Sequence, residues 1–145
     1  MSVRSGSRII LLGIAQLFLG RMAFSQDVLI VVNGNVGVTQ ITEIQLHDIF
    51  TGARTRFDNG SRAVPVILKG GPVHEVFLHR HVGDTPDEFR VRWRKAVFTG
   101  QGSMPRECAS EAELLKYVEG TPGAIGYVSR KPENSAVKFV TITLR

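Results

Sequence analysis

Short apolar runs alternate along the chain with segments that have helical spacing. The run 28–32 contains only Val, Leu and Ile, without alternation, and predicts a strand buried on both faces, of the kind found in parallel sheets. Runs at 64–68 and 124–128 and a β-branched run at 137–144 predict three more strands. Pro65 suggests that the strand 64–68 lies at a sheet edge or starts irregularly.

Helix signals lie between these runs. Four helices are predicted, and one of them starts at Pro72 and ends at Gly83. The other three begin with a capping box, formed by Thr42 and Gln45, by Thr85 and Glu88, and by Ser110 and Glu113. The buried face of the first should consist of Leu46, Ile49 and Phe50, and that of the second of Phe89, Trp93, Ala96 and Val97. The third should bury Leu114, Leu115 and Val118. Strands separated by helices predict an α/β domain with a mostly parallel sheet flanked by helices.

The N-terminal segment has the layout of a signal peptide. Arg4 and Arg8 precede an apolar stretch at 9–19, and Ala23 and Ser25 form a site for signal peptidase. The stretch is shorter than the roughly 20 residues that span a bilayer. We therefore predict a signal peptide at 1–25, an exported domain at 26–145, a periplasmic or secreted location, and no stable membrane insertion after cleavage.

Removal of the predicted signal peptide lowers the net charge of the chain. The 145 residues include 18 Lys and Arg and 13 Asp and Glu, a net charge of +5. The signal segment contains three arginines, the third being Arg21, and no acid, so 15 basic and 13 acidic residues remain and the net charge is +2. This balance argues against a nucleic-acid partner. The single cysteine, Cys108, excludes an intramolecular disulfide and predicts a buried, idle thiol.

Catalytic and metal signals are weak. His47, His74, His79 and His81 lack the spacing of a metal site and are interpreted as surface residues. Acids adjacent to a histidine, such as Asp48 beside His47, should point apart on a helix. The serines lack a nucleophile-elbow motif. The sequence therefore predicts no enzyme, no metal and no cofactor. Four basic residues are interpreted as a solvated helix face: Arg90, Arg92, Arg94 and Lys95.

One segment has a physical mechanism for binding an anion. Gly70 and Gly71 follow a predicted strand and precede a helix start, where unpaired backbone N–H groups carry positive potential. Lys69 adds a charge beside them. The candidate anion cradle consists of Lys69, Gly70 and Gly71 with the amides of Val73 and His74.

Several segments together resemble the substrate-binding proteins of phosphate ABC transporters. They are Leu-His-Asp-Ile-Phe-Thr-Gly at 46–52, the turn at 58–61, Gly-Gly-Pro-Val-His-Glu-Val-Phe at 70–77, Trp93 with 98–100, and Pro-Gly-Ala-Ile-Gly-Tyr-Val at 122–128. The resemblance covers most of residues 28–128. It implies a periplasmic-binding-protein-like fold, and the length suffices for one lobe of that two-lobed family, with a homodimer as one way to rebuild the cleft.

The resemblance also implies a changed ligand site. The family holds phosphate on a turn of the form Asp-x-Gly-Ser-Gly-Thr-Arg, and this chain has residues 70–74 where Gly, Ser, Gly, Thr and Arg would stand. The glycine backbone is kept, whereas the hydroxyls, the arginine and the acid are absent, with His74 in the place of the arginine. Two hypotheses follow: an exported solute-binding-type protein for phosphate or another small oxyanion serving an ABC transporter or sensor, or a ligand-free interaction module of the cell envelope.

Overall fold

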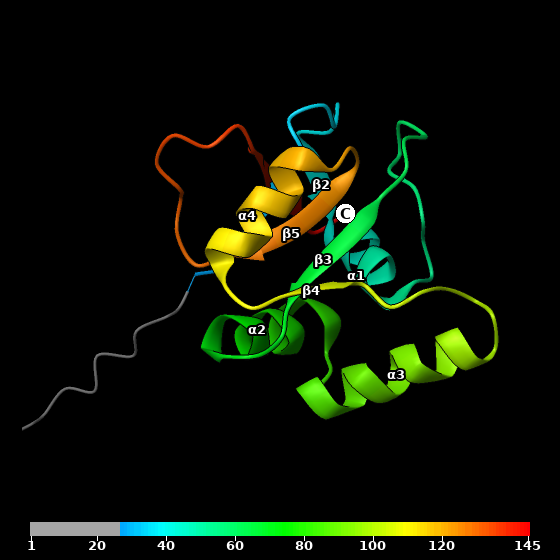
Figure 1. Ribbon diagram of the computed structural model, residues 1–145. Helices are drawn as coiled ribbons and strands as arrows, with labels where there is room; N and C mark the ends of the chain where they lie inside the picture. The colour runs from blue at the N-terminus through cyan, green and yellow to red at the C-terminus, as the bar shows by residue number, and fades with distance from the viewer. Residues whose placement is uncertain (1–26) are drawn as a thin grey trace, which may run out of the picture.

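The structure, a computed structural model, describes residues 27–145, so the predicted signal peptide lies outside the described residues. One sheet forms the centre of the fold, with helices on both of its faces (Figure 1). The strands are β1 (Leu29–Val32), β2 (Gln40–Thr42), β3 (Val64–Leu68), β4 (Arg106–Cys108), β5 (Ala124–Val128) and β6 (Lys138–Thr143). The helices are α1 (Glu43–Thr51), α2 (Pro72–Phe77), α3 (Pro86–Phe98) and α4 (Glu111–Gly120), and a π-helical turn, η1 (Leu78–Val82), continues α2. The predicted α/β class is confirmed.

The sheet is mixed, with the strand order β2-β6-β1-β5-β3-β4. Three neighbouring pairs are parallel: β2 with β6, β5 with β3, and β3 with β4. β1 is antiparallel to both of its neighbours, β5 and β6. The prediction of a parallel environment for this strand is therefore wrong, because uniform burial reports coverage of both sheet faces and carries no information on strand direction.

Pro65 does not mark a sheet edge. β3 lies inside the sheet between β5 and β4, but its pairing with β4 begins only at Val66, opposite Arg106. Pro65 thus precedes the first ladder position on that side, where no N–H donor is needed. The short strands β2 and β4 were not predicted, because three-residue segments lack a readable period.

Helix starts follow the predicted capping. In α1 and α3 both halves of the capping box are present, with Thr42 paired to Gln45 and Thr85 paired to Glu88. In α4 the Ser110 hydroxyl accepts from the Glu113 N–H as predicted, but the Glu113 carboxylate accepts from the N–H of Ala109 instead of closing the box. The starts of these three helices are thus stabilised by residues within four positions.

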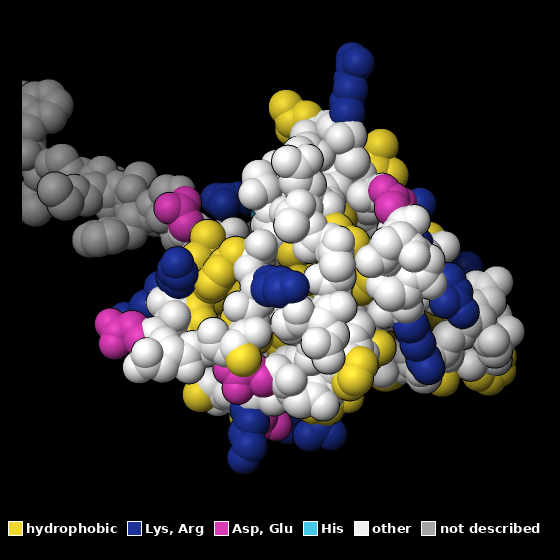
Figure 2. Space-filling view, turned by 90° about the horizontal axis from the view of Figure 1, so that it is seen from above, with side chains coloured by type: hydrophobic (Ala, Val, Ile, Leu, Met, Phe, Trp, Pro, Cys, Tyr) yellow, Lys and Arg dark blue, Asp and Glu magenta, His cyan; other side chains and the backbone are white. Residues whose placement is uncertain are grey.

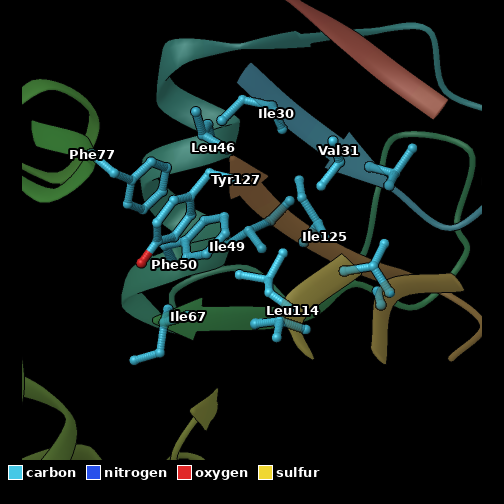
Figure 3. Packing of buried hydrophobic residues seen from close by; sticks show 14 of the residues in the cluster. Ile30, Val31, Leu46, Ile49, Phe50, Ile67, Phe77, Leu114, Ile125 and Tyr127 are labelled. Carbon is cyan, nitrogen blue, oxygen red and sulfur yellow. The ribbon is translucent and has the colours of Figure 1, made fainter. Parts of the chain in front are cut away.

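The core on one side of the sheet is aromatic (Figure 3). The Phe77 ring stacks on Tyr127 with a centroid separation of 3.9 Å and meets Phe50 edge-on at 4.7 Å. On the opposite side, Gly126 allows Leu114 of α4 to approach, since a Cβ there would lie 2.9 Å from the leucine side chain. Strand β5 is therefore buried on both faces.

No helix among residues 27–145 has the length and apolar character to cross a membrane.

Candidate functional site

Three strands have their carboxyl ends on the same side of the sheet, along the edge that runs across the strand ends. β5, β3 and β4 run parallel, so the segments after Val128, Leu68 and Cys108 all leave from this edge. β1 starts there as well, because Leu29 pairs with Val128. In open α/β sheets, ligands bind outside the carboxyl ends of the parallel strands. The predicted cradle follows β3 and therefore lies at the edge where a ligand is expected.

The backbone of the cradle is exposed and built on glycine. Gly71 is the N-cap of α2 and has φ 96° and ψ 172°, a region that is essentially restricted to glycine. No side chain caps α2 within the described part of the chain, so its first-turn amides depend on water or a ligand. A Cβ added at Gly70 or Gly71 would meet no heavy atom within 4 Å. The space above the two glycines is open to a small anion.

Lys69 lies beside this opening. Its side chain is exposed, and its backbone N–H donates to the Cys108 carbonyl oxygen at 2.9 Å. The bond ties the end of β3 to the end of β4 and fixes where the cradle begins. The Cys108 thiol itself is buried, and burial raises its pKa. This location agrees with the predicted buried thiol.

The His74 side chain is buried, whereas a side chain that binds a ligand at the cradle would be exposed. Its side chain is only 4% exposed and points into the core, where Nδ1 lies 2.5 Å from the Tyr127 hydroxyl oxygen. That oxygen also accepts from the Leu68 N–H at 3.0 Å. Burial, and secondarily the charge of Arg90, lowers the pKa of His74 to about 4, and burial raises the pKa of Tyr127. At neutral pH only the backbone N–H of His74 is available to the cradle, without an imidazolium charge.

The prediction of four surface histidines is wrong for two of them. His74 is buried as described, and His81 is buried with Nδ1 3.0 Å from a Glu43 carboxylate oxygen. The π-helical turn η1 turns His81 toward α1, which helical spacing alone does not predict. The prediction that Asp48 and His47 point apart is also wrong, since they contact at 3.0 Å. Within residues 27–145 no group of three or more His, Cys, Asp or Glu side chains could hold a metal.

Two serines follow strands that end at this edge, and both make hydrogen bonds. The Ser110 hydroxyl, after β4, caps α4. The Ser129 hydroxyl, after β5, contacts the Glu111 carboxylate at 2.9 Å, and the backbone N–H of Ser129 donates to the same carboxylate. The sequence did not reveal this link, because the two residues are 18 positions apart and belong to different elements. The Ser129 hydroxyl is thus engaged as a donor, and the donors within residues 69–74 themselves are backbone amides and the Lys69 side chain.

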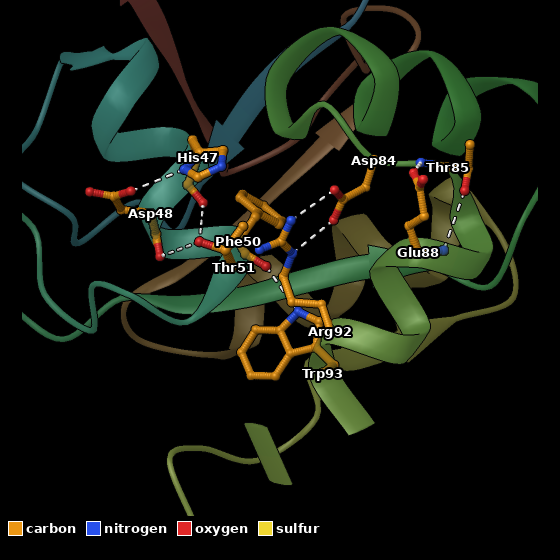
Figure 4. A network of polar contacts seen from close by, with 9 residues as sticks. All are labelled: His47, Asp48, Phe50, Thr51, Asp84, Thr85, Glu88, Arg92 and Trp93. Carbon is orange, nitrogen blue, oxygen red and sulfur yellow. Dashed lines mark hydrogen bonds and ion pairs between the residues drawn. The ribbon is translucent and has the colours of Figure 1, made fainter. Parts of the chain in front are cut away.

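A second polar region lies between α1 and α3, away from the cradle (Figure 4). The Arg92 guanidinium donates two hydrogen bonds of 2.8 Å to the Asp84 carboxylate, and the Trp93 indole N–H donates to the Phe50 carbonyl oxygen at 2.9 Å. A hollow of about 530 Å³ runs along this contact and is lined in part by Thr51 and Lys95. The Trp93 bond joins α3 to α1, and the Arg92–Asp84 pair holds α3 against the segment that precedes it.

The basic residues of α3 are exposed, and two of them pair with acids. Arg90, Arg92, Arg94 and Lys95 are all exposed on α3, in agreement with a solvated helix face. Arg90 contacts Asp87 and Arg92 contacts Asp84, so acids neutralise two of the four. Figure 2 shows the Lys and Arg side chains scattered over one face of the molecule rather than gathered in a patch.

Two solved structures share the fold. One is a candidate phosphate ABC transporter substrate-binding protein with bound phosphate from Clostridium perfringens, at 22% identity and a TM-score of 0.60, covering 79% of this chain and 44% of that chain. The other is an ABC-type phosphate transport receptor from Vibrio cholerae, at 18% identity and a TM-score of 0.52, covering 79% of this chain and 45% of that chain. The chain therefore spans less than half the length of either protein.

These similarities define the fold as a periplasmic-binding-protein-like lobe, a six-stranded sheet flanked by helices. No protein-family model matches the chain, and no curated protein matches it.

Proposed function

We propose that the chain is an exported solute-binding-type protein that binds phosphate or another small oxyanion at the cradle. The observation that carries this proposal is the exposed, glycine-built start of α2, with Gly71 in a glycine-only conformation and Lys69 beside it. Its position at the carboxyl ends of parallel strands supports the proposal, as does the bound phosphate in the Clostridium perfringens neighbour. Both neighbours are transport proteins, so we propose binding without catalysis, in the service of an ABC transporter or a sensor.

The proposed affinity is low. The donors are the backbone amides of Gly70, Gly71, Val73 and His74 and one exposed lysine, and water reaches them from the open side. A charged hydrogen bond that stays hydrated contributes less than one in a closed cleft. We therefore place the dissociation constant in the high micromolar to millimolar range, about −4 to −5 kcal/mol of binding free energy.

Titration calorimetry with phosphate and with sulfate near neutral pH tests the proposal. We expect saturable heat with at least one of the two anions, and a several-fold weaker affinity for Lys69→Gln. Lys138→Gln is the matched control, because Lys138 is an exposed lysine at the start of β6, at the opposite edge of the sheet. No heat up to about 10 mM of either anion, above the proposed dissociation constant, or equal loss in both variants, would contradict anion binding at this cradle.

The proposed location rests on the signal-peptide pattern of residues 1–25 and has its own test. Intact-mass spectrometry of the protein recovered from the periplasmic or secreted fraction should give the mass of a chain that begins at Gln26. Recovery of the uncleaved chain from the cytoplasmic fraction would contradict export.

A second candidate function is a ligand-free interaction module of the cell envelope. It is favoured by the Ser129 hydroxyl, which contacts Glu111, and by the inward-facing His74, which leaves the cradle without an imidazolium. Pull-down from an envelope extract distinguishes the two candidates. A specific partner recovered by a protein that binds neither anion would support the module.

A further inference from the structure

Helix α3 is covered on one side only. Phe89 and Trp93 are buried against the rest of the fold, and the indole N–H of Trp93 bonds to the end of α1. Figure 1 shows α3 lying along the outside of the molecule, apart from the sheet. The opposite side of α3 therefore faces away from the protein core.

The outward side carries a regular stripe. Asp87, Val91, Arg94 and Phe98 are spaced at i, i+4, i+7 and i+11, which places them on one face of the helix. Val91 is 58% exposed and Phe98 is 91% exposed, and neither belongs to the buried face predicted from the sequence. Val97 is itself 44% exposed, so that part of the predicted buried face is wrong. Val91 and Phe98 thus form a small apolar strip on a helix face that the rest of the protein does not cover.

The stripe is complementary to itself. Its acid lies in the first turn of α3 and its arginine lies two turns later, with the apolar residues interleaved. In an antiparallel pair related by a twofold axis near the middle of the helix, Asp87 of each copy comes within reach of Arg94 of the other. The two Val91 side chains meet near the axis, and Phe98 of each copy lies over the first turn of the other α3. Arg94 has no ion-pair partner within residues 27–145, and the intrahelical contact of Asp87 with Arg90 is exposed and easily exchanged.

The same stripe is poorly suited to a bilayer. A helix that lies in a membrane interface presents its main apolar face to lipid and keeps basic residues on the other side. The main apolar face of α3 is occupied by its own protein, and the outward stripe contains an acid, two apolar residues and an arginine. The mixed charge fits a second copy of this chain better than an anionic lipid surface.

We propose that the α3 stripe of Asp87, Val91, Arg94 and Phe98 is the self-association surface of this protein, which pairs two copies through antiparallel α3 helices. The proposal is independent of anion binding, since the stripe and the cradle lie on different elements. A single 13-residue helix per copy gives an interface at the small end of those seen between proteins. The dimer should therefore be weak and reversible, and should weaken further at high salt because its ion pairs are exposed.

Sedimentation velocity of the purified protein from about 10 μM to about 1 mM tests the proposal, a range chosen for a small interface. We expect a concentration-dependent rise in mass toward twice the monomer, and Phe98→Glu should abolish it. Ile44→Glu is the matched control, because Ile44 is also an exposed apolar helix residue, at 68%, but lies on α1. A monomer at all concentrations, or a dimer unaffected by Phe98→Glu, overturns the proposal.

A charge swap tests the antiparallel arrangement. Asp87→Arg and Arg94→Asp should each weaken association several-fold, and the double variant should recover most of it, because the two ion pairs are restored with reversed sign. Circular dichroism and melting temperature confirm that each variant folds. If the double variant remains as weak as the singles, the pairing is not the one proposed. If Phe98→Glu instead abolishes binding to vesicles of mixed neutral and anionic lipids while the protein stays monomeric, the stripe is a lipid-binding surface and the proposal is wrong.

Discussion

The two sides of the start of α2 contrast sharply. On the inner side, Phe77 and His74 pack against Tyr127, with ring separations of 3.9 Å and 6.2 Å. On the outer side, Gly70 and Gly71 have open space where a side chain would be, and Lys69 is exposed. The inner side is determined by packing and hydrogen bonds, whereas the outer side is determined only by backbone conformation. The contrast shows that the fold needs the inner residues, while the outer residues are free to serve a ligand.

The largest expected effect is on the inner side. Phe77→Ala removes the ring that stacks on Tyr127 and contacts Phe50, and it leaves a cavity in the aromatic core. We expect a loss of about 3–5 kcal/mol in the free energy of unfolding. Denaturant unfolding measures this. A loss below about 1 kcal/mol would show that the core on this side of the sheet is not packed as described.

The next effect concerns the pH dependence of stability through His74. Its pKa is lowered to about 4 in the folded chain from 6.5 in the unfolded chain, so the unfolded state binds more protons between these values. Stability should therefore fall as the pH falls from about 6.5 toward 4, by at most roughly 3 kcal/mol from this group. His74→Asn keeps an acceptor for the Tyr127 hydroxyl but cannot titrate. Its stability should depend less on pH than that of the wild type, and parallel curves would contradict the role of His74.

The smallest expected effect is the difference in stability between alanine variants of the two glycines on the outer side. Gly71→Ala places a Cβ at φ 96° and should cost about 1–3 kcal/mol. Gly70→Ala has no such strain and should change stability by less than about 0.5 kcal/mol, although its methyl group projects into the open space. Melting temperatures of the two variants measure the difference. Equal losses would mean that the cradle backbone does not depend on Gly71.

Local signals in the sequence predicted much of the fold. The capping pairs at Thr42 and Thr85 and the left-handed glycine Gly83 gave correct helix ends, since these depend on neighbours within four residues. Features that depend on distant residues were not predicted. The antiparallel direction of β1 follows from its pairing with β5, almost 100 residues away.

The candidate site was likewise predictable only where it depends on neighbouring residues in the sequence. Lys69, Gly70 and Gly71 are exposed at the strand end, as a strand-glycine-helix pattern indicates. The inward turn of His74 was not predictable, because its partner Tyr127 is 53 residues away and no local pattern links the two. The contact of Glu111 with Ser129 has the same cause.

The central claim is that the backbone amides of the cradle bind a small oxyanion. The most direct test is a titration of ¹⁵N-labelled protein with phosphate, followed by the amide resonances of Gly70, Gly71, Val73 and His74. We predict that these resonances shift first and furthest, along one saturable curve, while those of the opposite sheet edge near Lys138 stay in place. No shift at these four amides up to about 10 mM phosphate, a concentration well above the proposed dissociation constant, would contradict the claim.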